Sequence, residues 1–436
     1  MLFINRSYWP DGEATGQLLT ELSEDLADRF EISVVVGRPN ANPSGEHFRG
    51  VGSQVRNGVR ILRVPHTRLP KGWLPGRAIN FATFVASATV RATFCRRQDL
   101  IVVETDPFLL ALLGRLLRFR HRSRQVVYLQ DIHPDVGIAV GRLKENTLLR
   151  TLRRMLISEY RLADRVVVLS RDMRSTLIAA GVPEASVTRL PNWTDTNTIR
   201  PTAQNNRFRE SAKIARHDFL VMYSGNLGVT QQLDQVLEVA SRLRSRPGIL
   251  FAFVGGGSAE PALRSDAERR GLTNVRFFPY RTKHELGDSL SAADLQLVTV
   301  HPAALPFLMP SKLYGILAAG RPVLAAAPAE SELAQVVRDN RVGYVVPPGD
   351  LEAMTCAIVE AADHRDENAA LGDRARRLAE EAYDRPKITG QFGDLLDEIL
   401  SESEAVRHSV CRKEFNAAAG GRDSREGVKK DQVIPQ

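Results

Sequence analysis

Residues 305–323, LPFLMPSKLYGILAAGRPV, place Ser311 and Lys312 directly before an apolar segment with helical spacing, residues 313–319. A helix that begins at a Ser-Lys pair brings free backbone N–H groups and one cation to the same point, which suits an anion such as a diphosphate. Gly320 is typical of the residue that follows a helix, and the Arg-Pro-Val after it predicts a return into a buried strand. On its own this stretch predicts only a helix start; two earlier glycine turns of the same kind make it a candidate site.

The rest of the chain alternates short apolar runs with helical stretches. Strands that are apolar on both faces and separated by helices predict an α/β fold with parallel sheets, and ligands of such sheets bind beyond the carboxyl ends of the strands. The predicted strands cover residues 2–7, 32–36, 59–64, 101–104, 125–129 and 165–169 in the first half, and 219–223, 249–254, 275–278, 295–300, 323–326 and 343–346 in the second.

The two halves predict two similar α/β domains that enclose a cleft. At 436 residues the chain is too long for one ordinary core. Residues 190–201, followed by a polar stretch, are the predicted linker, so we expect domains at 1–195 and 196–403, with the last helix crossing back. Residues 404–436 lack apolar periodicity and are predicted to be disordered.

The composition predicts a cytoplasmic protein. No run of 18 apolar residues predicts a membrane-spanning helix, and the N-terminus MLFINRSYWP is typical of a strand and turn rather than of a signal peptide. Cys95, Cys356 and Cys411 have neither metal-ligand spacing nor the pattern of a disulfide framework. No cluster of His and Asp suggests a metal site, so we expect neither a metal nor a cofactor.

Positive charge is concentrated in the first half. Residues 1–195 contain 28 Lys and Arg and 19 Asp and Glu, a net charge of +9, whereas the remaining residues contain 31 and 32, a net charge of −1. Between Arg56 and Arg124 there are 14 basic and 3 acidic residues, a net charge of +11. This block predicts either a solvated arginine-rich surface or an anionic partner. Nucleic acid is the weakest such partner, because the basic and aromatic pattern of a known module is missing.

Two glycine turns follow strands of the second half. The first, YSGNLGVTQQ, contains Gly225, Asn226, Gly228 and Thr230, and the second, FVGGGS, contains residues 255–257, three consecutive glycines. Glycines let a phosphate approach the backbone, and each turn opens a helix whose N-terminus faces the same point. The alternative is that tight strand–helix turns need glycine for steric reasons alone.

Two loops of the first half are further candidates. The segment DIHPD, which contains His133, directly follows a strand, and the segment WPDGEATG, which contains Gly12 and Thr15, follows the first strand. A single histidine is more often structural than functional, and spacing does not decide between the two. The Gly-x-Gly-x-x-Gly fingerprint, the P-loop and Gly-x-Ser-x-Gly do not occur, which argues against a dinucleotide dehydrogenase, a P-loop enzyme and a serine hydrolase.

The order of these parts resembles that of the retaining glycosyltransferases of family 4, which have the GT-B fold of two Rossmann-like domains facing across a cleft. The resemblance covers roughly residues 1–400. Within the family, the chain looks most like the colanic-acid-type, cell-surface polysaccharide branch. It rests on the segments YWPDGEATGQLL, RLPNWTDTNTIRP, YSGNLGVTQQLDQVLEVA, FVGGG, VRFFPY, ADLQLVTV, PSKLYGILAAGRPV and VGYVVPPGD in this order.

The resemblance implies that the C-terminal domain holds a nucleotide-sugar donor and that sugar transfer proceeds with retention. His133 would meet the donor sugar, and Gly12 and Thr15 would shape the acceptor side. By similarity, the donor-binding residues are Gly225, Asn226, Gly228, Thr230, Gly255, Gly256, Gly257, Tyr280, Ser311, Lys312 and Tyr314. Lys312 would stabilise the departing diphosphate together with backbone N–H groups, so no metal ion would be required.

The sequence departs from the family at two positions. The family carries two glutamates eight residues apart, and the corresponding positions here are Phe307 and Gly315. Either Glu332 takes over the role of the ribose-binding glutamate, or the protein is a catalytically degenerate scaffold subunit. A nucleotide-sugar epimerase, which shares the GT-B layout, is the other alternative.

The resemblance also gives the basic block a meaning, because acceptors in this branch are often lipid-linked glycans. Basic and apolar side chains together favour an anionic membrane surface, which predicts a protein at the inner face of the plasma membrane. The residues assigned to this face are Arg68, Lys71, Trp73, Arg77, Arg115, Arg118, Phe119, Arg120, Arg122 and Arg124.

Overall fold

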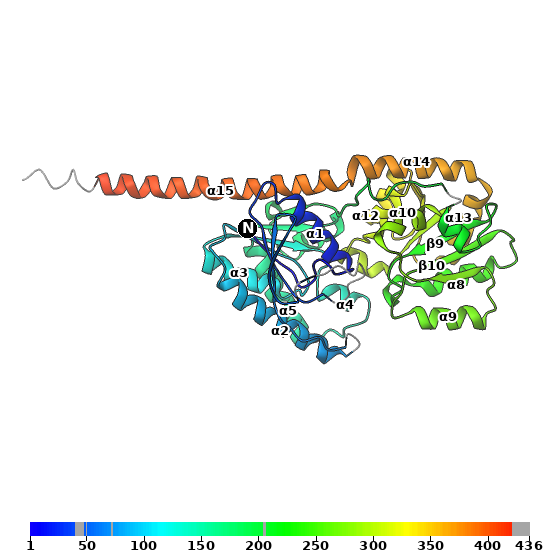
Figure 1. Cartoon of the computed structure of the whole chain (residues 1–436), viewed down its shortest axis with the longest axis horizontal. Helices are drawn as coiled ribbons and strands as arrows, with labels where there is room; N and C mark the ends of the chain where they lie inside the picture. Colours follow the sequence, from blue (N-terminus) through cyan, green and yellow to red (C-terminus); the bar gives the residue numbers. More distant parts are fainter. Residues whose placement is uncertain (40–47, 49, 71–72, 204–205, 421–436) are drawn as a thin grey trace, which may run out of the picture.

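The computed structural model describes residues 1–39, 48, 50–70, 73–203 and 206–420. Two α/β domains lie side by side, and a long C-terminal helix runs from the second domain along the first (Figure 1). The predicted α/β class with two mainly parallel sheets is confirmed.

The N-terminal sheet has the strand order β3-β4-β2-β1-β5-β6-β7-β8. All neighbours are parallel except β3 and β4, which form an antiparallel pair. Strands β1, β2 and β5 are buried along their whole length, as expected for a sheet covered by helices on both faces. The strands are β1 (Leu2–Ile4), β2 (Ser33–Val36), β3 (Gly52–Arg56), β4 (Val59–Arg63), β5 (Leu100–Val103), β6 (Arg124–Leu129), β7 (Arg165–Val168) and β8 (Val187–Arg189).

Two helices of the N-terminal domain, α5 and α6, begin at a polar side chain that caps them. The side chain of Asn146 accepts a hydrogen bond from the N–H of Leu149 at the start of α5, and Ser170 does the same for α6. The helices are α1 (Ala14–Asp25), α2 (Leu74–Thr93), α3 (Leu110–His121), α4 (Asp135–Ala139), α5 (Thr147–Leu162), α6 (Arg171–Ala179) and the 3-10 turn η1 (Glu184–Ser186).

The C-terminal sheet has the order β11-β10-β9-β12-β13-β14, and all its pairs are parallel. All six predicted strands are present: β9 (Phe219–Ser224), β10 (Ile249–Val254), β11 (Val275–Phe278), β12 (Leu295–Thr299), β13 (Val323–Ala326) and β14 (Gly343–Val346). The helices are α7 (Arg207–Ser211), η2 (Val229–Gln231), α8 (Leu233–Arg242), α9 (Glu260–Arg269), α10 (Lys283–Ser291), η3 (Pro302–Phe307), α11 (Lys312–Ala318), α12 (Glu332–Asp339), α13 (Leu351–Asp363) and α14 (Arg365–Ala382).

Each sheet has one topological switch point, where the chain reverses its direction of travel across the sheet. In the N-terminal sheet this point lies between β1 and β5, and in the C-terminal sheet it lies between β9 and β12. Ligands of open α/β sheets bind at the carboxyl ends of the two strands that flank such a point. The topology therefore singles out the loops after β9 and β12, and those after β1 and β5.

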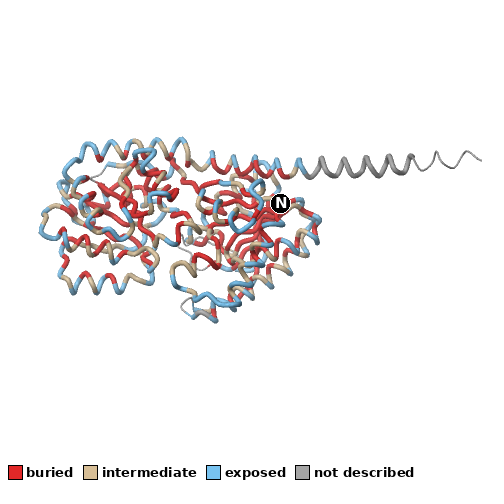
Figure 2. The backbone as a smooth tube through the Cα atoms, turned by 180° about the vertical axis from the view of Figure 1, so that it is seen from behind, coloured by how far each residue is buried: buried red, intermediate tan, exposed pale blue. Residues whose placement is uncertain are grey.

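The final helix ties the two domains together. The N–H of Thr194 donates to the carbonyl of Tyr383, and the N–H of Arg385 donates to the carbonyl of Thr194, each at 3.0 Å. Helix α15 (Arg385–Gly420) then runs along the N-terminal domain, where the ring of Phe392 lies 5.2 Å from that of Tyr128. Figure 2 shows buried positions recurring along this part of α15, in agreement with the burial of Ile388, Phe392, Leu395, Leu396 and Ile399.

The prediction of disorder from residue 404 onward is wrong as far as Gly420, because α15 continues to that residue. Residues 404–420 are rich in Glu, Arg, Lys and Ala, which favour a helix even without an apolar stripe. Residues 421–436 lie outside the described residues.

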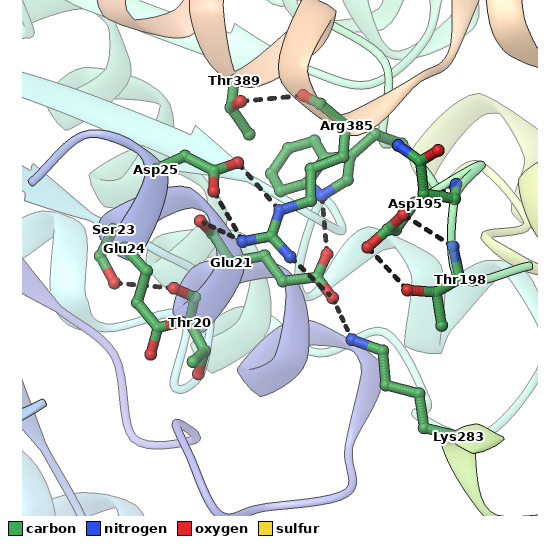
Figure 3. Close-up of polar contacts among 12 residues, drawn as sticks. Thr20, Glu21, Ser23, Glu24, Asp25, Asp195, Thr198, Lys283, Arg385 and Thr389 are labelled. Atoms are coloured by element: carbon green, nitrogen blue, oxygen red, sulfur yellow. Dashed lines mark hydrogen bonds and ion pairs between the residues drawn. The ribbon is translucent and has the colours of Figure 1, made fainter. Parts of the chain in front are cut away.

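Polar contacts at the start of α15 join four segments that are far apart in the sequence (Figure 3). Glu21 on α1 accepts hydrogen bonds from the indole of Trp193 (2.9 Å) and from the ammonium group of Lys283 on α10 (2.6 Å). Arg385 pairs with Asp25 at 2.6 Å. The largest hydrophobic core likewise contains residues of both sheets and of α15. The two domains are therefore packed against each other rather than merely tethered.

Candidate active site

The two predicted glycine turns pack directly on each other at the carboxyl edge of the C-terminal sheet. The N–H of Leu227 donates to the carbonyl of Gly256 (3.0 Å). Gly255 has a φ of +142°, and a Cβ atom on it would collide with the carbonyl oxygen of Gly225. A Cβ atom on Gly257 would likewise collide with Asn226 and Leu227. Close packing alone thus explains why residues 255 and 257 are glycines, because the first turn occupies the space that a Cβ atom would need at either position.

Lys312 begins α11 and reaches under the first glycine turn. Its Nζ atom lies 3.4 Å from the centre of the Tyr223 ring and 3.4 Å from the position that a Cβ atom of Gly225 would occupy. Although part of the side chain is exposed, Nζ is buried and has no hydrogen-bond partner among the described residues. Burial lowers the pKa of Lys312 well below its ordinary value. An anion beside Gly225 would therefore meet a buried amine that none of the described residues satisfies.

The remaining predicted donor residues lie around the same two turns. The hydroxyl group of Tyr280 donates to the carbonyl of Gly256 (2.8 Å), while its side chain is 61% exposed. Asn226 and Ser311 are exposed, and Gly228 is buried. The carbonyl of Thr230 accepts a hydrogen bond from the N–H of His301 (2.7 Å), which is the second residue after β12. Sequence reasoning missed His301, because nothing in the sequence shows that β9 and β12 are neighbours.

The structure places two predicted donor residues elsewhere. Glu332 is 3% exposed and accepts hydrogen bonds from Arg189 (2.6 Å) and from the backbone N–H of Arg171, both in the N-terminal domain. Tyr314 is buried against Tyr383 with ring centres 5.0 Å apart. We therefore remove both residues from the set of donor-binding residues. The Glu332 carboxylate already accepts hydrogen bonds across the domain interface, and the Tyr314 ring is buried against Tyr383.

Gly315 and Phe307 stand at the two positions where the family has glutamates. Gly315 has apolar surroundings, and Phe307 contacts the N-terminal domain. A Cβ atom on Gly315 would meet the side chains of Leu290 and Ile199 at ordinary contact distances of 3.5 and 3.8 Å. The carbonyl of Phe307 accepts a hydrogen bond from the N–H of Ile132 (2.8 Å) in the N-terminal domain. With Glu332 engaged as well, none of these three positions supplies a free carboxylate.

The loops of the N-terminal switch point form the opposite side. Arg6 after β1 pairs with Asp106 after β5 at 3.0 Å. Gly12 lies two residues before α1, and Thr15 is the second residue of this helix, at this same edge. The ring of His133 lies 5.5 Å from that of Phe108, and its neighbour Asp131 forms a β-bridge with Leu308. The His133 loop thus contacts the segment that directly precedes α11.

A second candidate surface lies on the outside of the N-terminal domain, where α3 packs between α2 and α5 (Figure 1). Phe94 and Phe119 are 78% and 70% exposed, and Leu148 is 75% exposed. We name this surface the α2–α3–α5 face; its other exposed apolar residues are Trp73, Ile79, Val90, Leu116, Met155 and Leu162. Helix α5 was not part of the predicted membrane face.

The charges of this face differ from the prediction in part. Arg118 and Arg124 both pair with Asp164, and Arg115 pairs with Glu159, so two carboxylates already offset most of the charge of three predicted lipid contacts. Among the described residues, no ion pair engages the arginines Arg77, Arg120, Arg122, Arg154 and Arg161. Lys71 lies outside the described residues. In the described part of the chain, no helix combines the length and hydrophobicity needed to cross a membrane.

The fold is that of the GT-B proteins, two Rossmann-like domains with mainly parallel sheets. The chain superimposes on the sucrose-phosphate synthase of Thermosynechococcus elongatus with a TM-score of 0.74 at 17% identity, covering 92% of this chain and 100% of that one. It also superimposes on HepE of Anabaena, solved in complex with UDP-glucose, with a TM-score of 0.70 at 18% identity, covering 91% and 99% of the two chains.

Sequence comparison gives the family. Residues 14–193 match the glycosyl transferase 4-like domain, and residues 204–378 match the glycosyl transferases group 1 family. The colanic acid biosynthesis glycosyl transferase WcaI of Escherichia coli K12 is 30% identical over 398 residues, which cover 88% of this chain and 97% of that protein. The chain belongs to the group 1 glycosyltransferases.

Proposed function

We propose that this glycosyltransferase moves a sugar from a nucleoside diphosphate donor to a growing, lipid-linked cell-surface glycan, with retention at the anomeric carbon. The observation that carries the proposal is the buried Nζ of Lys312 beside Gly225, which has no hydrogen-bond partner in the described part of the chain. The similarity to a protein named for colanic acid biosynthesis and to a structure solved with UDP-glucose supports it.

In this proposal Lys312 stabilises the leaving group. As the bond between the anomeric carbon and the diphosphate oxygen breaks, negative charge grows on the diphosphate. A fixed cation and backbone N–H groups stabilise that charge without reorganisation, and removing one such group typically costs about 100- to 1,000-fold in rate. Lys312 thereby supplies the positive charge without a metal ion. His133 approaches the donor sugar from the N-terminal domain, and Gly12 and Thr15 shape the acceptor side.

The α2–α3–α5 face suits a lipid-linked acceptor. Helices of βα units begin at the carboxyl edge of the sheet, so α2 and α3 begin on the side of the N-terminal domain that carries Gly12 and Thr15. Exposed aromatic and arginine side chains would rest on the anionic inner leaflet, and each basic residue near such a surface contributes about 1 kcal/mol. We therefore place the protein in the cytoplasm, at the inner face of the plasma membrane.

Thermal unfolding with UDP, GDP, ADP, CMP and dTDP at millimolar concentration tests the donor proposal. A ligand present at about 100 times its dissociation constant stabilises the native state by about 2.7 kcal/mol. We expect a clear rise in Tm with one of these nucleotides, and the matching nucleotide sugars would then be assayed with lipid-linked acceptors. If no nucleotide raises the Tm, the proposed donor site is refuted.

A catalytically degenerate scaffold is the second candidate, and the apolar surroundings of Gly315 favour it. A scaffold of this kind would bind a nucleotide, or none, without transferring sugar. Single-turnover assays with the sugar of the stabilising nucleotide separate the two candidates, because only an enzyme releases that nucleotide in proportion to glycan formed.

A further inference from the structure

We propose that His301 and Gln231 complete the donor site: His301 binds the diphosphate together with Lys312, and the amide oxygen of Gln231 accepts a hydrogen bond from a ribose hydroxyl. This inference rests on the proposed function and names the groups that recognise the donor where the usual glutamates are missing.

Both residues lie at the switch point of the C-terminal sheet. Gln231 ends the turn that follows β9, and His301 is the second residue after the neighbouring strand β12. The hydroxyl group of Thr299 donates to the carbonyl of Gln231 (2.7 Å), and the N–H of His301 donates to the carbonyl of Thr230 (2.7 Å). These two bonds hold both residues against the first glycine turn, at the position where open α/β sheets bind their ligands.

Three buried polar atoms around this turn lack a partner within the described ranges: Lys312 Nζ, His301 Nδ1 and Gln231 Oε1. Two of these atoms lie against the turn itself, and the backbone of His301 is hydrogen-bonded to Thr230 within it. A Cβ atom on Gly225 would lie 3.4 Å from Lys312 Nζ, and one on Gly228 would lie 2.8 Å from Gln231 Oε1. A buried polar group without a partner is costly, so three of them around one loop indicate a site built for a polar ligand.

The chemistry of the three atoms defines the class of ligand. Lys312 Nζ is only a donor and needs an acceptor such as a phosphate oxygen, whereas Gln231 Oε1 is only an acceptor and needs a hydroxyl or N–H donor. An imidazole N–H of His301 can donate to a phosphate oxygen. A ligand that satisfies all three therefore presents both anionic oxygens and a hydroxyl group. A nucleoside diphosphate does so, and inorganic pyrophosphate supplies only the oxygens.

This difference between the two ligands gives the test. Dissociation constants of the stabilising nucleoside diphosphate and of inorganic pyrophosphate are measured by calorimetry for the wild type, His301→Phe and Gln231→Leu. We expect His301→Phe to weaken both ligands by about 10-fold, because a hydrogen bond to a charged group is lost. Gln231→Leu should weaken the nucleoside diphosphate by about 5-fold and leave pyrophosphate binding unchanged. His217→Phe, whose imidazole is 84% exposed at another edge of the domain, is the matched control.

Each part of the inference can be overturned separately. Unchanged binding of both ligands by His301→Phe refutes the role of His301, and His301→Ala repeats the measurement if the larger ring prevents folding. Equal weakening of both ligands in Gln231→Leu refutes the ribose contact. If Lys312→Met loses nucleotide binding while both other variants bind normally, the proposed function stands and this inference falls. If the wild type binds no nucleoside diphosphate, both fall together.

Discussion

The Nζ atom of Lys312 lies 3.4 Å from the centre of the Tyr223 ring and is buried beneath the turn that contains Gly225. The ring face is its nearest source of negative potential, because none of the described residues accepts a hydrogen bond from it. The unliganded protein thus holds a lysine whose charged form is poorly stabilised. Such a residue contributes little to stability and much to the binding of an anion.

We therefore expect Lys312→Met to separate stability from activity. Sugar transfer should fall by about 100- to 1,000-fold, because the charge that stabilises the leaving diphosphate is removed. The Tm of the unliganded protein should not fall, because methionine fills similar space without a buried amine. Turnover assays measure the expected loss of sugar transfer, and thermal unfolding measures the Tm. A lower Tm together with unchanged turnover would contradict both expectations.

Nucleotide binding should take up a proton. Burial lowers the pKa of Lys312 in the free protein, and a bound diphosphate favours the charged amine and so raises that pKa. Between the two pKa values the free protein has lost the proton that the complex retains, so affinity should weaken as pH rises. Calorimetry at pH 7.5 to 9 in buffers of different ionisation enthalpy measures the uptake. Lys312→Met should abolish it, and an equal uptake in that variant would refute the assignment.

Gly255→Ala should be strongly destabilising. The new Cβ atom would collide with the carbonyl oxygen of Gly225, and the φ of +142° is strained for alanine. We expect a loss of about 2–4 kcal/mol, measured by urea unfolding. Gly248→Ala is the matched control, because its φ is also positive (+82°) but open space surrounds it; a loss of about 1 kcal/mol is expected there. Equal losses at both positions would contradict the packing of the two turns.

Stability should fall with rising pH because of Glu104. Both carboxylate oxygens of this residue are buried and lack a hydrogen-bond partner in the described part of the chain, and burial raises its pKa well above 4.5. Above pH 4.5 the unfolded chain has lost a proton that the native protein still binds, so the free energy of unfolding decreases by up to about 1.4 kcal/mol per pH unit until the native pKa is passed. Glu104→Gln should flatten this dependence in urea unfolding between pH 5 and 8. An unchanged slope would show that other groups cause it.

The double variant Phe94→Ser/Phe119→Ser should weaken binding to vesicles that contain anionic phospholipid. Each phenylalanine contributes about 1.5–3 kcal/mol when it leaves water, so a loss of at least 10-fold is expected in flotation assays. Val55→Ser is the control, because Val55 is 69% exposed on β3, outside the α2–α3–α5 face. If the wild type does not float with anionic vesicles, the membrane face is refuted.

Elements with strong local patterns were predictable from the sequence. Most strands were predicted from short runs of β-branched residues. The end of α11 was predicted from Gly320, which has a φ of +63°. Strand β3 was missed because its residues are polar and largely exposed, so it lacks the apolar signal of a central strand. The end of α15 was missed because helix propensity, rather than amphipathicity, maintains it.

The site was predictable as a set of loops but not as a set of contacts. Lys312 and Gly225 were identified because glycine turns and a helix start have recognisable sequences. Tyr314 and Glu332 were expected at the donor site but contact Tyr383 and Arg189 instead, because a position along the chain does not show which surface a side chain faces. His301 was missed because its partner Thr230 lies in the turn after β9, a strand that only the sheet order places beside β12.

The backbone passes between the domains twice, and Thr194 on one passage is hydrogen-bonded to Tyr383 and Arg385 on the other. The two crossings are hydrogen-bonded to each other and lie beside a hydrophobic core that both domains share, so they fix the orientation of one domain relative to the other. A single cut in the linker would therefore leave the domains joined, since the second crossing still connects them.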